Sequence, residues 1–257
     1  MLNTVLHGEG QPGRPLIIAH GLFGSARNWG AIAKRMAKAR PVVAVDMRNH
    51  GDSPHLATHS YADMASDLAD VITEHGGIAD VLGHSMGGKA AMVLALSHPQ
   101  TVARLIVADI APVAYSHTQT GYIDAMEGVD VSSIKLRRDA DLALQAQVPD
   151  LPTRAFLTQS LDLSGEPARW RLNLPVLRAE MDKIIGFPDV TGSFAGPALF
   201  LSGGASDYVK DSHHAGIKAL FPNAEFSDIA GAGHWLHAEA PAPFIAALSE
   251  FLERTSA

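Results

Sequence analysis

The sequence places a serine between glycines in a setting typical of a catalytic nucleophile. Ser85 is the centre of GHSMG (residues 83–87), which fits the pattern G-x-S-x-G. A short apolar run ending at Leu82 precedes the motif, and an Ala-rich, helix-compatible stretch follows it. In a strand–turn–helix of this kind the glycines permit a sharp turn that exposes the serine hydroxyl. The motif therefore predicts Ser85 as nucleophile, with the backbone N–H of Met86 as an oxyanion donor.

A histidine near the C-terminus has the surroundings that a general base needs. His234 lies in GAGHW (residues 231–235), directly after a predicted strand at residues 225–229. A glycine loop gives the imidazole freedom to move without a competing side chain. The chain holds 13 histidines, but His234 also follows Ser85 in the order Ser, Asp, His that this type of site uses. We therefore expect His234 to be the base.

The acid that would orient this histidine has two candidates. Asp109 ends the apolar run at residues 105–108, and Asp207 follows the run at residues 198–201. Either carboxylate could accept the ring N–H of the base and stabilise the imidazolium. Asp46 also ends an apolar run, but Arg48, two residues later, favours a structural ion pair or a turn there. Asp109 and Asp207 both stay open at this point.

Other residues are candidates for the rest of the site. The loop HGLFG (residues 20–24) follows the first apolar run, and the backbone N–H of Leu22 can act as the second oxyanion donor. Phe23, Ser206 and Trp235 are candidate substrate-binding residues. Lys89, in the helix after Ser85, is expected to pack or to form a surface ion pair. No histidine group shows the pattern H-E-x-x-H, so neither a metal nor a cofactor is expected.

The elements that must position these residues alternate along the chain. Short apolar runs occur at residues 16–19, 42–45, 81–82, 105–108 and 198–201, and helical patterns at 64–74, 86–98 and 244–254. Continuous rather than alternating apolar runs predict strands buried on both faces of a mostly parallel sheet. Residues 113–195 contain no convincing buried strand and are too long for a loop. We therefore predict an α/β core (1–112 and 196–257) with an inserted helical cap (113–195).

Composition excludes several other classes of protein. The chain has 257 residues, a formal charge of −7 without basic stripes, and no cysteine. Nucleic-acid binding is therefore not expected, and no apolar run approaches the roughly 20 residues needed to cross a membrane. The N-terminus lacks the pattern of a secretory signal, which favours the cytoplasm. The oligomeric state stays open, with a homodimer as one alternative.

These motifs resemble the α/β-hydrolase superfamily, from HGLFG through VDMRNHGDS and GHSMGGK to GAGHW. HGLFGSARNW, DIAPVAY and GAGHWLHAEAP look especially like the group of bacterial esterases typified by YbfF and its eukaryotic relatives. The resemblance implies that the aspartate of DIAP, Asp109, is the acid. It also places a serine, Ser206, in the loop where most superfamily members carry their acid. Because Asp207 lies beside that serine, this sequence departs from the group, although we favour Asp109.

The resemblance also implies an activity. It indicates a serine esterase or thioesterase that acts on a small acyl ester, with Ser85, His234, Leu22 and Met86 in the roles given above. A cofactor-free haloperoxidase or a C–C bond hydrolase would use the same triad. A small-molecule receptor without catalysis is an alternative from another class. The sequence does not identify the substrate.

Overall fold

A seven-stranded sheet forms the centre of the protein. The computed structural model describes residues 1–255. The strand order is β1-β3-β2-β4-β5-β8-β9, with β1 antiparallel to β3 and the other neighbouring pairs parallel. The strands are β1 (Thr4–His7), β2 (Leu16–Ala19), β3 (Val42–Val45), β4 (Ala79–His84), β5 (Val102–Ala108), β8 (Ala198–Gly203) and β9 (Ala224–Ile229). The predicted mostly parallel sheet is confirmed, and β1 is an additional edge strand.

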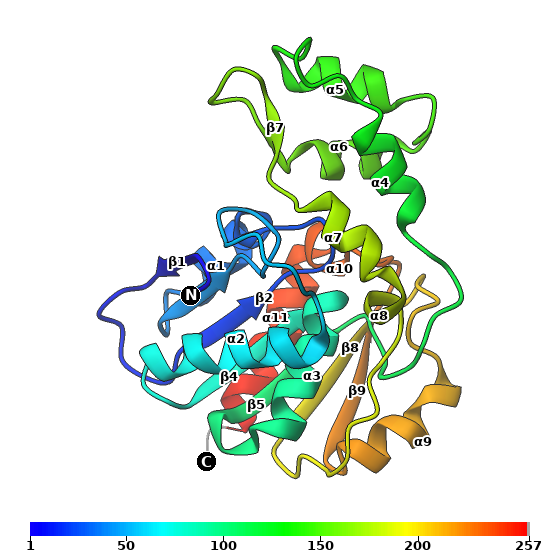
Figure 1. Ribbon diagram of the computed structural model, residues 1–257. Helices are drawn as coiled ribbons and strands as arrows, with labels where there is room; N and C mark the ends of the chain where they lie inside the picture. The colour runs from blue at the N-terminus through cyan, green and yellow to red at the C-terminus, as the bar shows by residue number, and fades with distance from the viewer. Residues whose placement is uncertain (256–257) are drawn as a thin grey trace.

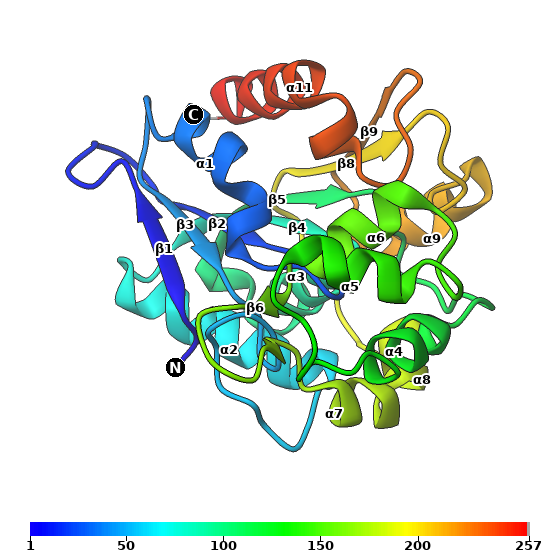
Figure 2. The ribbon, with the colours of Figure 1, turned by 90° about the horizontal axis from the view of Figure 1, so that it is seen from above.

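Helices cover both faces of this sheet, which explains why its strands are apolar throughout. Helices α1 (Gly30–Met36) and α11 (Pro241–Arg254) lie on one face, and α2 (Tyr61–Glu74) and α3 (Met86–Ser97) on the other (Figure 2). Two layers of buried side chains result, one on each face. The remaining helices of the α/β body are α9 (Asp211–Leu220), α10 (Leu236–Glu239) and the 3-10 turns η1 (Ala26–Trp29) and η2 (Pro99–Thr101).

Two predicted helices begin earlier than their apolar patterns indicated. The side chain of Ser60 accepts a hydrogen bond from the backbone N–H of Asp63, so α2 starts at Tyr61 rather than at residue 64. Pro241 occupies the first position of α11, where its missing N–H costs nothing. The apolar periodicity therefore located both helices, while local capping residues determined where they start.

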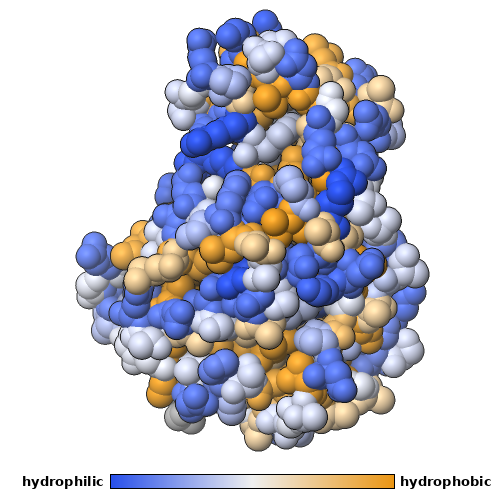
Figure 3. Space-filling model, in the orientation of Figure 1, coloured by the Kyte–Doolittle hydropathy of each residue, from blue (hydrophilic) through white to orange (hydrophobic). Residues whose placement is uncertain are grey.

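Most of the residues between β5 and β8 rise above the carboxyl ends of the strands. We call residues 113–195 the cap. Figures 1 and 3 show its helical part as a narrower lobe on the broad α/β body, whereas its last residues return along the body, where the N–H of Phe194 donates to the carbonyl of Leu220 at 2.8 Å. Leu136, Leu142 and Leu151 are exposed on it. Its elements are α4 (Thr120–Glu127), α5 (Arg137–Leu144), α6 (Leu151–Thr158), β6 (Leu161–Asp162), β7 (Arg169–Trp170), α7 (Leu174–Ala179) and α8 (Met181–Ile185). The β6–β7 pair forms a small antiparallel sheet of its own.

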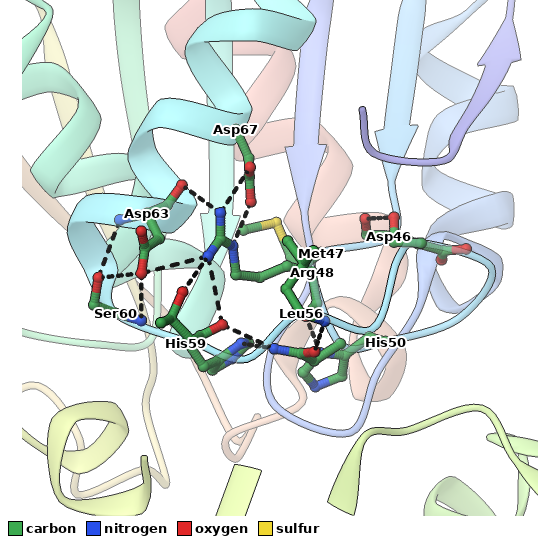
Figure 4. A network of polar contacts seen from close by, with 12 residues as sticks. Asp46, Met47, Arg48, His50, Leu56, His59, Ser60, Asp63 and Asp67 are labelled. Carbon is green, nitrogen blue, oxygen red and sulfur yellow. Dashed lines mark hydrogen bonds and ion pairs between the residues drawn. The ribbon is translucent and has the colours of Figure 1, made fainter. Parts of the chain in front are cut away.

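The loop after β3 is held by polar side chains, but not by the expected pair of Asp46 with Arg48. Arg48 instead binds Asp67 of α2, through Nε at 2.6 Å and Nη2 at 2.9 Å, and Asp63 lies 3.4 Å away (Figure 4). Asp46 accepts hydrogen bonds from the backbone N–H of Ala26 and from other groups of the loop. The ion pair was the wrong alternative, because the nearest opposite charge in space comes from a helix and not from the same loop. The other alternative, a turn, is present, and the Asp46 carboxylate accepts from the N–H of Asp52 within it.

The loop after β3 also forms hydrogen bonds with the middle of the cap segment. The backbone N–H of Gly51 donates to the carbonyl of Arg171 at 2.8 Å, and that of Asn173 donates to the carbonyl of Asn49 at 3.0 Å. His50 and Leu172 form an isolated antiparallel bridge between these two bonds. In residues 1–255, no helix is both long and apolar enough to cross a membrane.

Candidate active site

The turn between β4 and α3 holds Ser85 in a conformation that few residues adopt. Its backbone angles are φ 52° and ψ −119°, far from the favoured regions for a residue with a side chain. The flanking glycines make this turn sterically feasible. A Cβ on Gly83 would lie 2.2 Å from the carbonyl oxygen of Gly87, and a Cβ on Gly87 would lie 2.4 Å from that of Ala19. The sequence pattern thus produces the sharp turn that it predicted.

Three side chains from separate loops form a continuous chain of hydrogen bonds. His234 Nε2 lies 3.1 Å from Ser85 Oγ, and His234 Nδ1 lies 2.7 Å from Asp109 Oδ2. Because an ionised carboxylate can only accept, Nδ1 carries the proton, and Nε2 is left to accept the serine proton. This is the geometry that a serine nucleophile with a histidine base requires.

Asp109, rather than Asp207, contacts the imidazole. Asp109 is fully buried, has a positive φ of 51°, and also accepts hydrogen bonds from the Gly203 N–H at 2.9 Å and the Ser206 hydroxyl at 2.5 Å. Asp207 is exposed. Ser206 therefore lies behind the carboxylate and is not among the residues that line the cavity described below.

Neighbouring rings hold His234 from two sides. Tyr208 stacks on the imidazole, with 3.9 Å between ring centroids. His84 Nε2 lies 2.8 Å from the backbone carbonyl of His234, to which it donates its proton. Burial lowers the pKa of His84 well below its ordinary value, and the nearby His234 and His237 lower it further. A neutral His84 can therefore restrain the loop of His234 without adding a charge.

The loop after β2 leaves one backbone N–H unpaired close to Ser85. The N–H of Phe23, a residue with φ 63°, donates to His50 Nε2 at 3.1 Å. By contrast, the N–H groups of Leu22 and Met86 have no acceptor within residues 1–255. Both predicted oxyanion donors are thus available to a ligand. A Cβ on Gly21 would lie only 3.2 Å from Ser85 Cβ, which shows how closely this loop approaches the serine.

Two buried histidines contact the loop after β2 and the start of α3. His20 accepts a hydrogen bond from the Met47 N–H at 2.9 Å, and its Nδ1 lies 2.8 Å from the Gly21 carbonyl. His59 Nε2 lies 3.2 Å from Met86 Sδ. Burial lowers the pKa of His20, and it lowers that of His59 to about 3, so both rings are neutral near pH 7. Despite these histidines, the described part of the chain contains no cluster of three or more His, Cys, Asp or Glu side chains suited to a metal ion.

A cavity of about 240 Å³ opens at Ser85 between the α/β body and the cap. Phe23, Met86 and Trp235, all singled out from the sequence, line it. Trp235 packs against Phe156 of α6, with ring centroids 5.4 Å apart. The lining is mainly aromatic and aliphatic, as expected for a pocket that holds a small organic molecule.

Sequence reasoning missed two features of this cavity. Lys89 was expected to pack or to form a surface pair, but it is 1% exposed and lines the cavity without an ion pair to any described carboxylate. All four tyrosines of the chain line the cavity too: Tyr61, Tyr115, Tyr122 and Tyr208. The signal available for the first feature was a lysine inside the apolar helix that follows Ser85. No local sequence pattern indicates that the four tyrosines line one cavity.

Comparisons with known proteins agree with this fold. A family model described as alpha/beta hydrolase fold matches residues 14–241. The mouse sn-1-specific diacylglycerol lipase ABHD11 is 43% identical over 247 residues, covering 92% of this chain and 80% of its own length. Esterase YbfF of Escherichia coli K12 is 37% identical over 240 residues, covering 93% and 92%. A solved structure described as a marine microorganism esterase superimposes with a TM-score of 0.92 at 38% identity, covering 98% of this chain and 99% of its own.

Proposed function

The chain belongs to the α/β-hydrolase family, and on that premise we propose that it is a serine esterase that cleaves carboxylic or thio-esters. The observation that carries this proposal is the hydrogen-bonded chain of Ser85, His234 and Asp109 beside the cavity. The similarity to proteins named esterases and lipases supports the same class of reaction.

In the proposed reaction, His234 accepts the proton of Ser85 as Oγ attacks the ester carbonyl carbon. Asp109 stabilises the imidazolium that forms, because it is ionised and bonded to Nδ1. His234 then gives the proton to the leaving alcohol or thiol. Water, activated by the same histidine, hydrolyses the acyl-serine and restores the enzyme. The steps need only side chains, backbone N–H groups and water.

The negative charge that develops on the carbonyl oxygen is assigned to the N–H groups of Leu22 and Met86. Met86 begins α3, so its N–H lies at the positive end of the helix dipole. Loss of one such donor typically costs about 3 kcal/mol of transition-state stabilisation. The cap acts in this proposal as a cover that keeps bulk water from the acyl-enzyme, with Phe156 and Leu157 of α6 over the cavity.

The test compares hydrolysis of 4-nitrophenyl acyl esters by the wild type and three variants. Ser85→Ala should lose activity by about 10⁴-fold or more, because the nucleophile is absent. Asp109→Asn should fall by a similar order, since the wrong tautomer of His234 is then favoured. Asp207→Asn, an exposed aspartate from the same region, is the matched control and should retain activity.

The alternatives give different results in the same assay. Equal rates for the wild type and Ser85→Ala would refute the proposal. Loss of activity in Asp207→Asn but not in Asp109→Asn would change the identity of the acid. A wild type that binds esters tightly without hydrolysing them would instead be a receptor.

A further inference from the structure

Lys89 is a buried amine without a matching anion. Its side chain leaves α3 one turn after Ser85 and is 1% exposed. The ammonium donates to the backbone carbonyl of Ile185 at 2.8 Å and to that of Gly186. No carboxylate of residues 1–255 forms an ion pair with it. Removing a charge from water is unfavourable unless another charge compensates it, so this arrangement calls for a reason.

Holding the cap in place is not a sufficient reason. The adjacent carbonyl, that of Ile184, is bound by the hydroxyl of Tyr61 at 2.6 Å. The carbonyl of Ile185 also accepts from the backbone N–H of Tyr115 at 3.0 Å. Neutral donors thus already tie this segment of the cap to its surroundings. A third neutral donor could do the same work without the cost of a buried charge.

The position of the ammonium indicates a ligand. In its protonated form Lys89 has three N–H donors, and one of them then has no acceptor within residues 1–255 once Ile185 and Gly186 are counted. Lys89 lines the same cavity as Ser85, and Nζ lies 4.8 Å from the ring centroid of Tyr115. The hydroxyl of Tyr122, which also lines the cavity, has no partner among the described residues. A charged donor and a phenol therefore face the space that the substrate would occupy.

We propose that this cavity binds a carboxylate carried by the ester substrate, with Lys89 as the charged donor and Tyr122, which lines the same cavity, as a second hydrogen-bond donor. The inference rests on the proposed esterase function and narrows its substrate class to esters with an anionic end. A single ammonium is a point charge suited to a small anion. Burial lowers the pKa of Lys89 to about 7, and a bound carboxylate would favour its protonated form.

The test uses pairs of stable esters that differ only in a terminal carboxylate. In one pair, monoethyl glutarate and ethyl pentanoate, the charge lies on the acyl side. In the other, 4-acetoxybutanoate and butyl acetate, it lies on the alcohol side. The wild type should have the higher kcat/KM for the charged member of at least one pair. In Lys89→Met, the charged-to-neutral ratio for that pair should fall at least tenfold.

Lys183→Met is the matched control, because Lys183 is an exposed cap lysine that pairs with Glu180. It should leave the ratio unchanged. A wild type that prefers the neutral member of both pairs overturns the inference without any variant. An equal loss for both members in Lys89→Met would assign the lysine to holding the cap only. Failure of the esterase proposal is distinct, since neutral esters would then not be hydrolysed, or would be hydrolysed equally by Ser85→Ala.

Discussion

Replacing His237 by phenylalanine should make the protein more resistant to acid. His237 is 8% exposed, stacks on Trp29 with ring centroids 4.1 Å apart, and has no hydrogen-bond partner for its buried Nδ1 within residues 1–255. A phenylalanine ring can fill the same place on Trp29. We therefore expect His237→Phe to change the free energy of unfolding little at pH 7.

The expected gain appears on acidification. Burial lowers the pKa of His237 from 6.5 to about 3. Between these values the unfolded chain binds a proton that the folded chain does not, so the free energy of unfolding falls as the pH falls. From pH 7 to pH 5 the loss due to one such histidine is about 2 kcal/mol. Burial also lowers the pKa of His59 to about 3, and its contribution has the same sign and size. These losses are a large part of a typical stability of about 5–15 kcal/mol.

Urea unfolding at pH 7 and at pH 5 measures this effect. The loss of stability between the two pH values should be smaller by about 2 kcal/mol in His237→Phe than in the wild type. Phe244→Leu is the control, because Phe244 packs near both Trp29 and His237 and does not titrate. It should lower stability equally at both pH values. An unchanged pH dependence in His237→Phe would refute the reasoning that this ring is held neutral by burial.

Three further predictions concern the site and its support. Ser206→Ala should reduce kcat more than it raises KM, because Asp109 loses its 2.5 Å hydrogen bond and then orients His234 less firmly. Steady-state kinetics with a neutral ester would measure both parameters, and a change in KM alone would contradict this prediction. Gly87→Ala should yield little folded protein, since its Cβ would meet a backbone oxygen at 2.4 Å; a circular dichroism melt equal to that of the wild type would contradict the steric argument. Arg48→Met should destabilise the fold by about 3–5 kcal/mol, because it leaves the partly buried Asp67 without its partner. Urea unfolding measures this loss, and a loss below about 1 kcal/mol would mean that solvent compensates the carboxylate.

Much of the sheet and part of the site could be predicted because their signals are local. The buried strands appear as continuous apolar runs, and Ser85 and His234 each lie in a short glycine-rich motif. The choice between Asp109 and Asp207 is different, because both follow a strand in the same way. What separates them in space is the path of the chain at the end of β8 and just after it, which brings the Gly203 N–H and Ser206 to Asp109. Such a path depends on tertiary packing.

Lys89 and the tyrosines show the same limit. A lysine in a helix is usually solvated, and its burial follows from how the cap packs over α3. Tyr61, Tyr115 and Tyr208 are far apart in sequence, and only the fold brings them to one cavity. Contacts between distant segments leave no periodicity or spacing to read. For this reason the structure was needed to find the polar groups of the pocket, whereas the sequence alone indicated Ser85 as the proposed nucleophile.

The attachment of the cap at residues 171–173 restricts how the cavity can open. A rigid rotation of the whole cap about its two connecting segments would break the bonds of Asn173 and Arg171 to the loop after β3. Helix α4 is bound in turn to α7, since Arg178 pairs with Glu127 at 2.6 Å. Helices α5 and α6 contact the body at two places. Phe156 packs against Trp235, and the side chain of Gln159, at the end of α6, accepts a hydrogen bond from the side chain of Asn28. We therefore expect that a substrate enters when α5 and α6 alone move away from the body, while the rest of the cap keeps its contacts.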